Sequence, residues 1–325
     1  MNIQTVVHQG LSFVNVTKPT DFEMKFLKTT YYFNPLNLED YAHKTQIPKI
    51  ENHKKYDLVV LRFPLFSENV PQDSHQYGVR LPIFHANNNK KRRLMSSYVN
   101  FFISKEYVIA LHDGLLPQIN RIFSLCQKSL HNRTEYMSQG SAFLTYKLID
   151  ALVDDCFPPI NEITATIDKI DKDLEHKQSQ KTLEEISATR RNLVVFHTMI
   201  KPILPLFHQL KNGEHKELNG MMQPFWSNIL DHLQKIMDRV EDNQELIEGI
   251  SESNESLLSS HSNQIIKVLT IFSAIILPLN LLASVYGMNV NLPFTDDPFI
   301  FWKMILLMIL TTLSMLVAFT YKKWF

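Results

Sequence analysis

The sequence predicts a membrane protein of mixed class, with an N-terminal α/β domain, a region of long helices and two transmembrane helices at the C-terminal end. Three observations predict this class. The first third of the 325 residues holds short apolar runs bounded by turn residues, which are typical of strands. From about Gln118 onward, apolar residues recur at helical spacing. The C-terminal end holds two apolar stretches long enough to cross a bilayer.

The strand signals fall within residues 1–135, which we expect to form the α/β domain. Residues 58–61 are an apolar run that precedes Pro64. Residues 98–103 and 107–111 are two further runs, and the three residues between them have the length of a hairpin loop. The sequence therefore predicts a sheet that includes a β-hairpin.

Residues 136–262 form the expected helical region. Pro158 and Pro159 predict the end of one helix, because proline lacks the N–H group that a helix interior needs. The longest pattern runs from Phe225 to Leu277 without a proline, and its apolar residues recur at steps of three and four or their multiples: Ile229, Leu233, Ile236, Val240, Ile247, Ile250 and Leu257. Such a pattern predicts a coiled coil or a helix that continues into a membrane, and both interpretations apply here.

Composition argues against several function classes. The 33 basic and 33 acidic residues balance, so the chain lacks the basic excess of a nucleic-acid-binding protein. Glycine is scarce, at 8 residues, and no GxGxxG or P-loop motif occurs, so we expect no nucleotide cofactor. Cys126 and Cys156 form no CxxC pair, which fits free thiols in a reducing compartment. No nucleophile and base stand in a catalytic pattern, so the sequence does not predict an enzyme.

Two apolar segments predict a transmembrane hairpin within residues 263–325. We expect the first helix at about residues 265–286 and the second at about residues 299–320. A short polar link joins them, so both ends of the hairpin lie on the same side of the membrane.

Charge placement orients this hairpin. Lys267 precedes the core of the first span and Lys322 and Lys323 follow the second, whereas the link carries only Asp296 and Asp297 as charges. By the positive-inside tendency, the two ends lie in the cytosol and the link lies outside. The N-terminus lacks a basic segment followed by an apolar one, so we expect no signal peptide. The expected location is the inner (plasma) membrane, with several passes and with both termini cytosolic.

The first predicted transmembrane helix carries a polar face. Seven positions at alternating steps of three and four share one side of the helix: Asn263, Ile266, Thr270, Ser273, Leu277, Asn280 and Ser284. Amides that face lipid lack hydrogen-bond partners, at a cost of about 1 kcal/mol or more each. That face must therefore meet protein or water. Spacing alone leaves two interpretations equally open, a pore among several subunits and a polar seam between two helices.

The end of this helix carries a specific motif. Tyr286, Gly287, Met288 and Asn289 read YGMN at the outer end of the first of two C-terminal spans, and in this the chain resembles the CorA magnesium transporter family. The strong match covers about residues 262–325, and the rest matches only in layout. The resemblance implies a homopentamer whose long helices, the pore helix included, form a funnel-shaped cytosolic stalk. It also implies an ion path along the five-fold axis, so it favours the pore over the seam.

The resemblance further implies roles for individual residues. Gly287, Met288 and Asn289 would form the selectivity filter, with five Asn289 amides accepting hydrogen bonds from the waters of Mg²⁺ at the outer mouth. The pore lining would comprise Asn263, Thr270, Ser273, Asn280 and Ser284. The hydrophobic gate, which blocks ions by dewetting, would comprise Ile266, Leu269 and Leu277.

One departure from the family pattern concerns the outer mouth. Many members carry acidic residues directly after the motif, but Val290 and Asn291 follow it here. Attraction of cations then falls to Asp296 and Asp297.

A second departure concerns regulation by internal Mg²⁺. Asn228 stands where the resemblance leads us to expect an aspartate, and an amide is a poorer cation ligand than a carboxylate. Asp231 and Glu252 lie on the same helix and are candidate regulatory metal ligands. We hypothesise that feedback closure by internal Mg²⁺ is altered or weakened.

These features predict a potential-driven divalent cation channel that admits Mg²⁺, with Co²⁺ and Ni²⁺ as further candidate ions. Mg²⁺ is then the transported ion and a candidate regulatory ligand, and no cofactor is expected. The expected partners are further copies of the chain, membrane lipid and divalent cations, but not nucleic acid. The alternatives are a zinc or other transition-metal transporter on the same fold, a membrane-tethered enzyme and a structural anchor.

Overall fold

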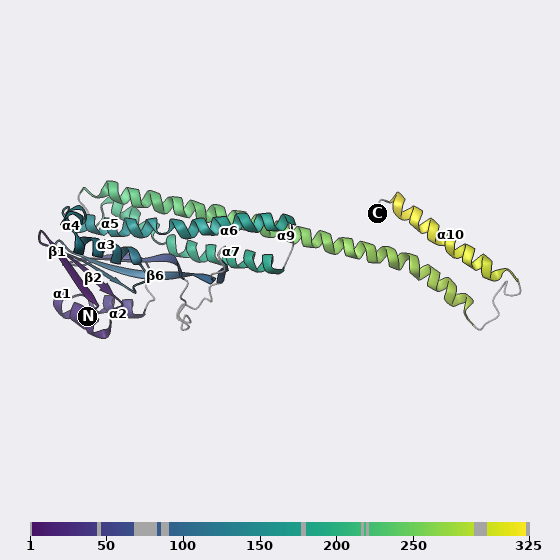
Figure 1. Ribbon diagram of the computed structural model, residues 1–325, viewed down its shortest axis with the longest axis horizontal. Helices are drawn as coiled ribbons and strands as arrows, with labels where there is room; N and C mark the ends of the chain where they lie inside the picture. The colour runs from purple at the N-terminus through teal and green to yellow at the C-terminus, as the bar shows by residue number, and fades with distance from the viewer. Residues whose placement is uncertain are drawn as a thin grey trace. The chain divides into compact units, whose positions relative to one another are not determined.

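The computed structural model describes residues 2–43, 47–67, 83–85, 91–176, 180–215, 218, 221–288 and 298–322. The chain divides into two compact units, Met1–Ser251 and Glu252–Phe325, which are described one at a time (Figure 1). The longest helix, α9 (Gln223–Tyr286), begins in the first unit and ends in the second, which also holds α10 (Ile300–Tyr321).

A seven-stranded sheet forms the centre of the first unit. Its strands follow the order β1-β2-β7-β6-β4-β3, and β5 pairs with β6 beside this path. Strands β2 and β7 pair in parallel and the other pairs are antiparallel. The strands are β1 (Ile3–His8), β2 (Leu11–Thr17), β3 (Lys49–Asn52), β4 (Asp57–Ser67), β5 (Ile83–His85), β6 (Lys91–Ile103) and β7 (Tyr107–His112).

The predicted hairpin is confirmed. Residues 98–103 lie in β6 and residues 107–111 lie in β7, and these strands pair antiparallel. The Ser104 N–H donates to the Tyr107 carbonyl at 2.8 Å and closes the turn. The register brings Ile103 opposite Val108.

Strand β4 contains the predicted run at residues 58–61 and continues through Pro64, although a proline has no N–H to donate. The strand tolerates this proline because of the direction in which its backbone nitrogen points. The His53 N–H donates to the Tyr56 carbonyl, so from Tyr56 onward the backbone N–H and C=O groups of every second residue point toward β3. The backbone nitrogen of Pro64 also points toward the β3 side. Pro64 lies beyond Val60, however, which is the last residue of β4 that pairs with β3. The missing N–H therefore falls on an edge where the described part of β3 has ended.

Eight helices of the described chain lie wholly in the first unit. They are α1 (Asp21–Tyr31), α2 (Pro35–His43), α3 (Pro117–Lys128), α4 (Leu130–Met137), α5 (Ser141–Asp154), α6 (Phe157–His176), α7 (Gln180–Ile200) and α8 (Leu204–Asn212). The predicted break at Pro158 and Pro159 is confirmed, because α5 ends at Asp154 and both prolines lie in the first turn of α6, where N–H groups have no partner within the helix.

The two faces of the sheet build two separate cores, since successive side chains of a strand point to opposite sides. On β4, Val59 and Leu61 join the large cluster formed with the helices after β7. Leu58 and Val60 join the smaller cluster, where Phe33 stacks on Phe102 with ring centroids 4.1 Å apart. Figure 1 shows α1 and α2 on one face of the sheet and α3, α5, α6 and α7 on the other.

The large core extends along the chain from Val6 to Ile250. It takes side chains from the strands and from the helices up to the first part of α9, including Trp226, Ile229 and Leu233, which are fully buried. The regularly spaced apolar residues predicted for this segment therefore pack into the core of the first unit. The packing of this part of α9 into the core also explains why the first compact unit extends to Ser251.

Helix α9 continues without a break for 64 residues, which corresponds to about 96 Å at the rise of an α-helix. Pro278 lies inside it. The architecture thus confirms the predicted class: an α/β part, a long helix and apolar C-terminal helices.

Three helical segments of the described chain are long and apolar enough to cross a membrane. The most apolar window of Thr182–Asn212 is 44% buried, so this segment belongs to the protein core. The corresponding windows of α9 and α10 are only 6% and 0% buried. Apolar helices that remain uncovered by their own chain need lipid or further protein around them.

Candidate functional site

The polar face predicted for the first transmembrane helix lies along the C-terminal half of α9. All seven of its positions, from Asn263 to Ser284, are helical and exposed within the single chain. Leu277, at the middle of the face, is 66% exposed. The Thr270 hydroxyl donates to the Ile266 carbonyl at 2.7 Å, one turn earlier on the same helix. Leu269 is also exposed and lies at the edge of this face.

The covered positions of this part of α9 lie on a different side of the helix. Ile271 is only 8% exposed, and the half-buried positions that follow it recur at helical spacing: Ala274, Pro278 and Leu282. Helix α10 of the same unit shows a matching half-buried face made of Met304, Met308, Thr311 and Met315. These covered positions lie on another side of the helix than the polar face. The polar face of α9 is therefore left free for contacts outside the chain.

The first two residues of the predicted filter terminate α9. The Gly287 N–H donates to the Ala283 carbonyl at 2.9 Å, and the Met288 N–H donates to the Val285 carbonyl at 3.3 Å. A Cβ added at Gly287 would lie 3.1 Å from the Ala283 carbonyl oxygen, which is tighter than ordinary contact. Glycine has no Cβ and therefore avoids this contact at the end of α9. The third filter residue, Asn289, and the outer acidic pair, Asp296 and Asp297, lie outside the described residues.

The two candidate regulatory ligands on α9 do not meet. Asp231 and Glu252 are both exposed and belong to different compact units. They stand roughly six turns, about 30 Å, apart along one helix. Within one chain they cannot share an ion, so each stays a separate prediction.

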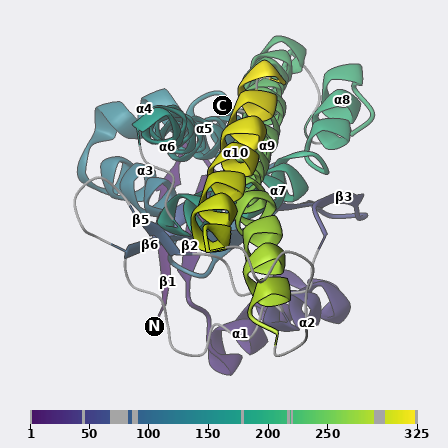
Figure 2. The same cartoon turned by 90° about the vertical axis from the view of Figure 1, so that its right-hand side faces the viewer.

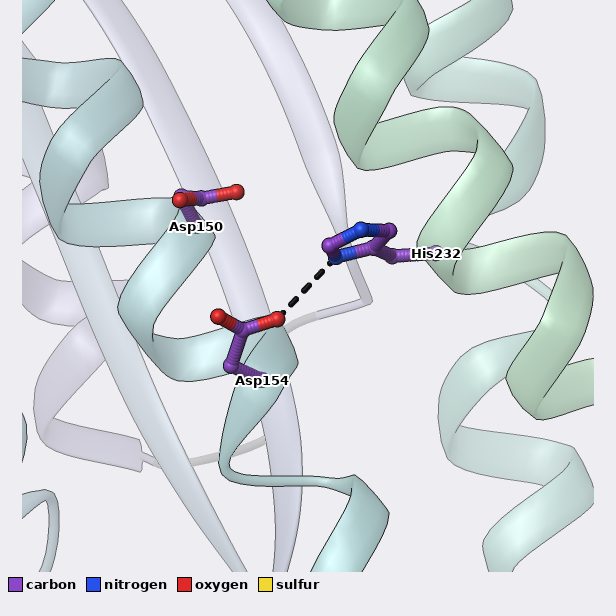
Figure 3. Close-up of side chains that lie close together, drawn as sticks. All are labelled: Asp150, Asp154 and His232. Atoms are coloured by element: carbon purple, nitrogen blue, oxygen red, sulfur yellow. Dashed lines mark hydrogen bonds and ion pairs between the residues drawn. The ribbon is translucent and has the colours of Figure 1, made fainter.

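A second group of polar side chains, which the sequence did not predict, joins α5 to α9. Asp150 and Asp154 lie one turn apart on α5, and Asn228 and His232 lie one turn apart on α9. The Asn228 amide donates to Asp150 Oδ1 at 3.3 Å. His232 Nδ1 lies 3.0 Å from Asp154 Oδ1 (Figure 3). Figure 3 shows the imidazole of His232 facing the two carboxylates across the gap between the helices.

Electrostatics distinguish the Asp150 carboxyl within this group. Burial raises the pKa of the Asp150 carboxyl, and the neighbouring charge of Asp154 raises it further. His232, Lys147 and the Asn228 amide oppose that shift. Within the described chain, these two carboxylates and the imidazole form a group whose ligand atoms all lie within 4.8 Å of one another. The carboxylate oxygens and the imidazole nitrogen of this group can bind a cation or a proton.

Sequence reasoning missed this group for an identifiable reason. The sequence presents Asn228 only as a weakened ligand position, and no motif marks His232. The signal in the sequence is a pair of four-residue spacings, Asp150 with Asp154 and Asn228 with His232. Each spacing predicts a shared helix face, but only the fold tells which two faces meet.

Comparison with known proteins gives the broader context. Residues 63–323 match the model of a family described as CorA-like Mg²⁺ transporter protein. The chain is 27% identical over 312 residues to YfjQ of Bacillus subtilis. The aligned part covers 94% of this chain and 88% of that protein. It is also 27% identical over 297 residues to the cobalt/magnesium transport protein CorA of Thermotoga maritima, covering 90% and 76% of the two chains.

A solved structure shares the fold. The complete structure of the CorA magnesium transporter from Methanocaldococcus jannaschii superposes with a TM-score of 0.76 at 17% identity. The superposition covers 98% of this chain and 94% of that one. The likeness therefore extends over the sheet, the long helix and the apolar C-terminal helices together.

Proposed function

Because the chain belongs to the family of CorA-like Mg²⁺ transporter proteins, we propose that it is a passive channel for divalent cations, with Mg²⁺ as the ion that it admits. The observation that carries this proposal is the polar face of α9, which is exposed, whereas the partly covered positions lie on another side of the helix. In lipid such a face costs free energy unless water or protein meets it. A water-filled path satisfies it.

Several copies of the chain must surround that path, since one chain supplies only one such helix. We propose a homopentamer in the inner (plasma) membrane, with both termini in the cytosol. The number five comes from the family resemblance, and the orientation comes from the lysines at both ends of the hairpin and the two aspartates of its link.

The chemistry of the proposed path suits a hydrated ion. Mg²⁺ releases its waters reluctantly, so a conducting site must bind it through those waters. Rings of Asn289, Asn280 and Asn263 offer neutral amide oxygens, which accept hydrogen bonds from the bound waters without trapping the ion. Ile266, Leu269 and Leu277 add apolar rings between them, where closure expels water and stops conduction.

The membrane potential suffices as the driving force. A divalent ion gains about 4.6 kcal/mol from 100 mV, at about 2.3 kcal/mol per elementary charge. A zinc transporter on the same fold is less well supported, because the polar groups along the α9 face are amides and hydroxyls. Zn²⁺ favours imidazole and thiolate, whereas hydrated Mg²⁺ favours oxygen.

Flux into liposomes tests the proposal. The full-length protein is reconstituted with a magnesium-sensitive dye inside the vesicles, and influx is recorded under an inside-negative potential. Asn289→Ala is compared with Asn291→Ala, a matched loss of an amide two residues away. We expect influx that grows with the potential, is lost in Asn289→Ala and is kept in Asn291→Ala.

Two outcomes contradict the proposal. Equal influx through Asn289→Ala and the unmodified protein removes Asn289 as the selective site. An absence of Mg²⁺ influx through correctly assembled, unmodified protein rejects the magnesium channel itself, and the same vesicles read with a zinc dye then test the alternative ion.

A further inference from the structure

We infer that Arg62, Ser96 and Asn100 form a binding site for a small free anion, inorganic phosphate, on the sheet of the first unit. The three residues lie on β4 and β6, whereas the polar face of α9 belongs to the other unit. The site therefore does not depend on the proposed transport. These two strands bury polar side-chain atoms that have no hydrogen-bond partner in the described chain.

The register of the sheet brings these side chains together. Arg62 of β4 stands opposite Tyr98 of β6, and Val60 stands opposite Asn100. Residues two apart on a strand share a face, so Asn100 lies on the side of Arg62 and Tyr98. The same side holds Val60 and Phe102 of the smaller core. Asn100 is diagonal to Arg62, at a separation of about 7–8 Å that a long side chain can span.

The Arg62 guanidinium has donors available along one edge. Its Nη2 donates to the Ser96 hydroxyl at 2.9 Å. Nη2 carries two hydrogens, so one remains, and the adjacent buried Nε–H has no acceptor in the described chain. Parallel Nε–H and Nη2–H groups are the pair that holds an oxyanion in bidentate geometry. The Ser96 hydroxyl accepts from Arg62 and keeps its own hydrogen to donate.

Asn100 supplies an amide from the interior of the sheet. It is 0% exposed, and neither its Nδ2 nor its Oδ1 has a hydrogen-bond partner in the part of the chain that the structure describes. A buried amide without partners costs free energy, so its presence in a native fold calls for an explanation. An oxyanion bound at the Arg62 edge can accept a hydrogen bond from Asn100 Nδ2.

The charge around Arg62 favours an anion. Lys49 stands on the same face of the sheet, and its Nζ lies 2.7 Å from Glu51 Oε1 and 3.5 Å from Asp40 Oδ2. No described carboxylate forms such a pair with Arg62, whose printed partners are the Ser96 hydroxyl and the ring of Tyr98, 5.1 Å from the ring centroid. The aromatic ring holds the plane of the guanidinium but leaves its charge uncompensated.

A basic run lies at the same end of β6. The first three residues of the strand, Lys91, Arg92 and Arg93, are all basic. Strand β5 pairs with this end of β6 (Figure 2). A cluster of like charges raises the local concentration of counter-ions, so it would draw anions toward the strand.

The buried amide selects the kind of anion. Asn100 Nδ2 needs an acceptor, but Asn100 Oδ1 needs a donor. Inorganic phosphate keeps at least one proton at neutral pH, so one of its oxygens can donate while the others accept. Sulfate has no such proton and would leave Oδ1 unpaired. The site should therefore prefer phosphate to sulfate, although both fit the guanidinium edge.

Calorimetric titration tests this inference. Full-length protein in detergent is titrated with inorganic phosphate and, at equal ionic strength, with sulfate. Arg62→Lys keeps the charge but loses the guanidinium edge, and Arg191→Lys makes the same change at an exposed position of α7 as a matched control. We expect one phosphate per chain, weaker sulfate binding, phosphate affinity reduced at least about tenfold in Arg62→Lys, and no change in the control.

Asn100→Leu tests the amide separately. Leucine has a similar size but no polar atoms, so we expect weaker phosphate binding together with an unchanged or higher unfolding temperature in phosphate-free buffer. That combination excludes misfolding as the cause of the lost binding. Equal affinity for phosphate and sulfate in the unmodified protein would remove the assigned role of Asn100.

Two further results overturn the site itself. One is unchanged phosphate affinity in Arg62→Lys. The other is an absence of phosphate binding by the unmodified protein. If that protein instead binds short-chain phosphatidic acid, the anion is a lipid headgroup and the assignment to a free ion is wrong. The Mg²⁺ flux assay is a separate readout, so failure of this site leaves the proposed channel standing.

Discussion

His112 is the most consequential buried titratable side chain of the sheet. It lies at the end of β7, where the Gly114 N–H donates to its Nδ1 at 3.2 Å. The proton of the neutral ring therefore sits on Nε2, which donates to Asn15 Oδ1 at 3.0 Å. Asn15 in turn donates from its amide to Asn120 Oδ1 at 2.8 Å, which connects the sheet to α3. Burial lowers the pKa of His112 to about 4.

Acid should destabilise the first unit through His112. Its folded-state pKa lies below its ordinary value of 6.5, so its contribution to stability is complete above pH 6.5 and is lost as pH falls through about 4. The loss at pH 4 is on the order of 3 kcal/mol. His112→Gln keeps an amide donor but does not titrate, so we expect its unfolding temperature to fall less steeply between pH 6.5 and 4.

Circular dichroism during thermal unfolding measures this slope. His131→Gln, which changes an exposed histidine of α4, serves as the control and should follow the unmodified protein. Identical slopes for His112→Gln and the unmodified protein would show that His112 does not control the acid response.

At the scale of the element, α9 has two different roles along its length. Up to Ile250 its apolar side chains pack into the core of the first unit, and beyond that the chain leaves most of the helix exposed. The buried Asn243 marks the packed part, where its amide donates to the Thr164 hydroxyl of α6 at 2.9 Å. The exposed part carries the polar face that we assign to the ion path.

Replacing one amide of that face should reduce conduction without unfolding the protein. In Asn280→Leu, an exposed polar position becomes apolar, and a ring of leucines would favour loss of water from the path. We expect Mg²⁺ influx into liposomes to fall about tenfold or more, equivalent to at least about 1.4 kcal/mol on the barrier. Ser314→Ala, at an exposed position of α10, should leave influx unchanged. Equal influx in Asn280→Leu and the control would place the ion path elsewhere.

At the scale of the whole molecule, the apolar helices of the second unit are incomplete without an environment. The most apolar windows of α9 and α10 are 6% and 0% buried. Lipid can cover the apolar sides, but the polar face of α9 needs water or further protein, which further copies of the chain supply in the proposed channel. Assembly is therefore a condition of the proposed function.

Native mass spectrometry of the protein released from detergent tests that assembly. We expect a single main species at five times the 37.9 kDa of one chain. Asn289→Ala should give the same species, since the proposed role of Asn289 lies in selectivity. A main species of two chains would instead support the polar helix–helix seam and contradict the five-fold pore.

Local patterns in the sequence were sufficient to predict several structural features of this protein. The hairpin between residues 98 and 111, the break before α6 and the polar face of α9 are each set by spacing within one segment. Side-chain directions along one helix or strand follow from its own period, so such features need no knowledge of the rest of the fold. The short motif at residues 286–289 indicated the family, and the family match over residues 63–323 confirmed it.

Tertiary structure alone decided which of these faces meet. Asp150 and Asn228 are 78 residues apart in the chain, as are Asp154 and His232, and only the packing of α5 beside α9 brings them within hydrogen-bonding distance. The passage of β4 through Pro64 likewise depends on where β3 ends. Burial also identified the apolar segment Thr182–Asn212 as core, although its composition alone would allow a membrane span. Contacts between distant segments depend on the whole fold, and no local period encodes them.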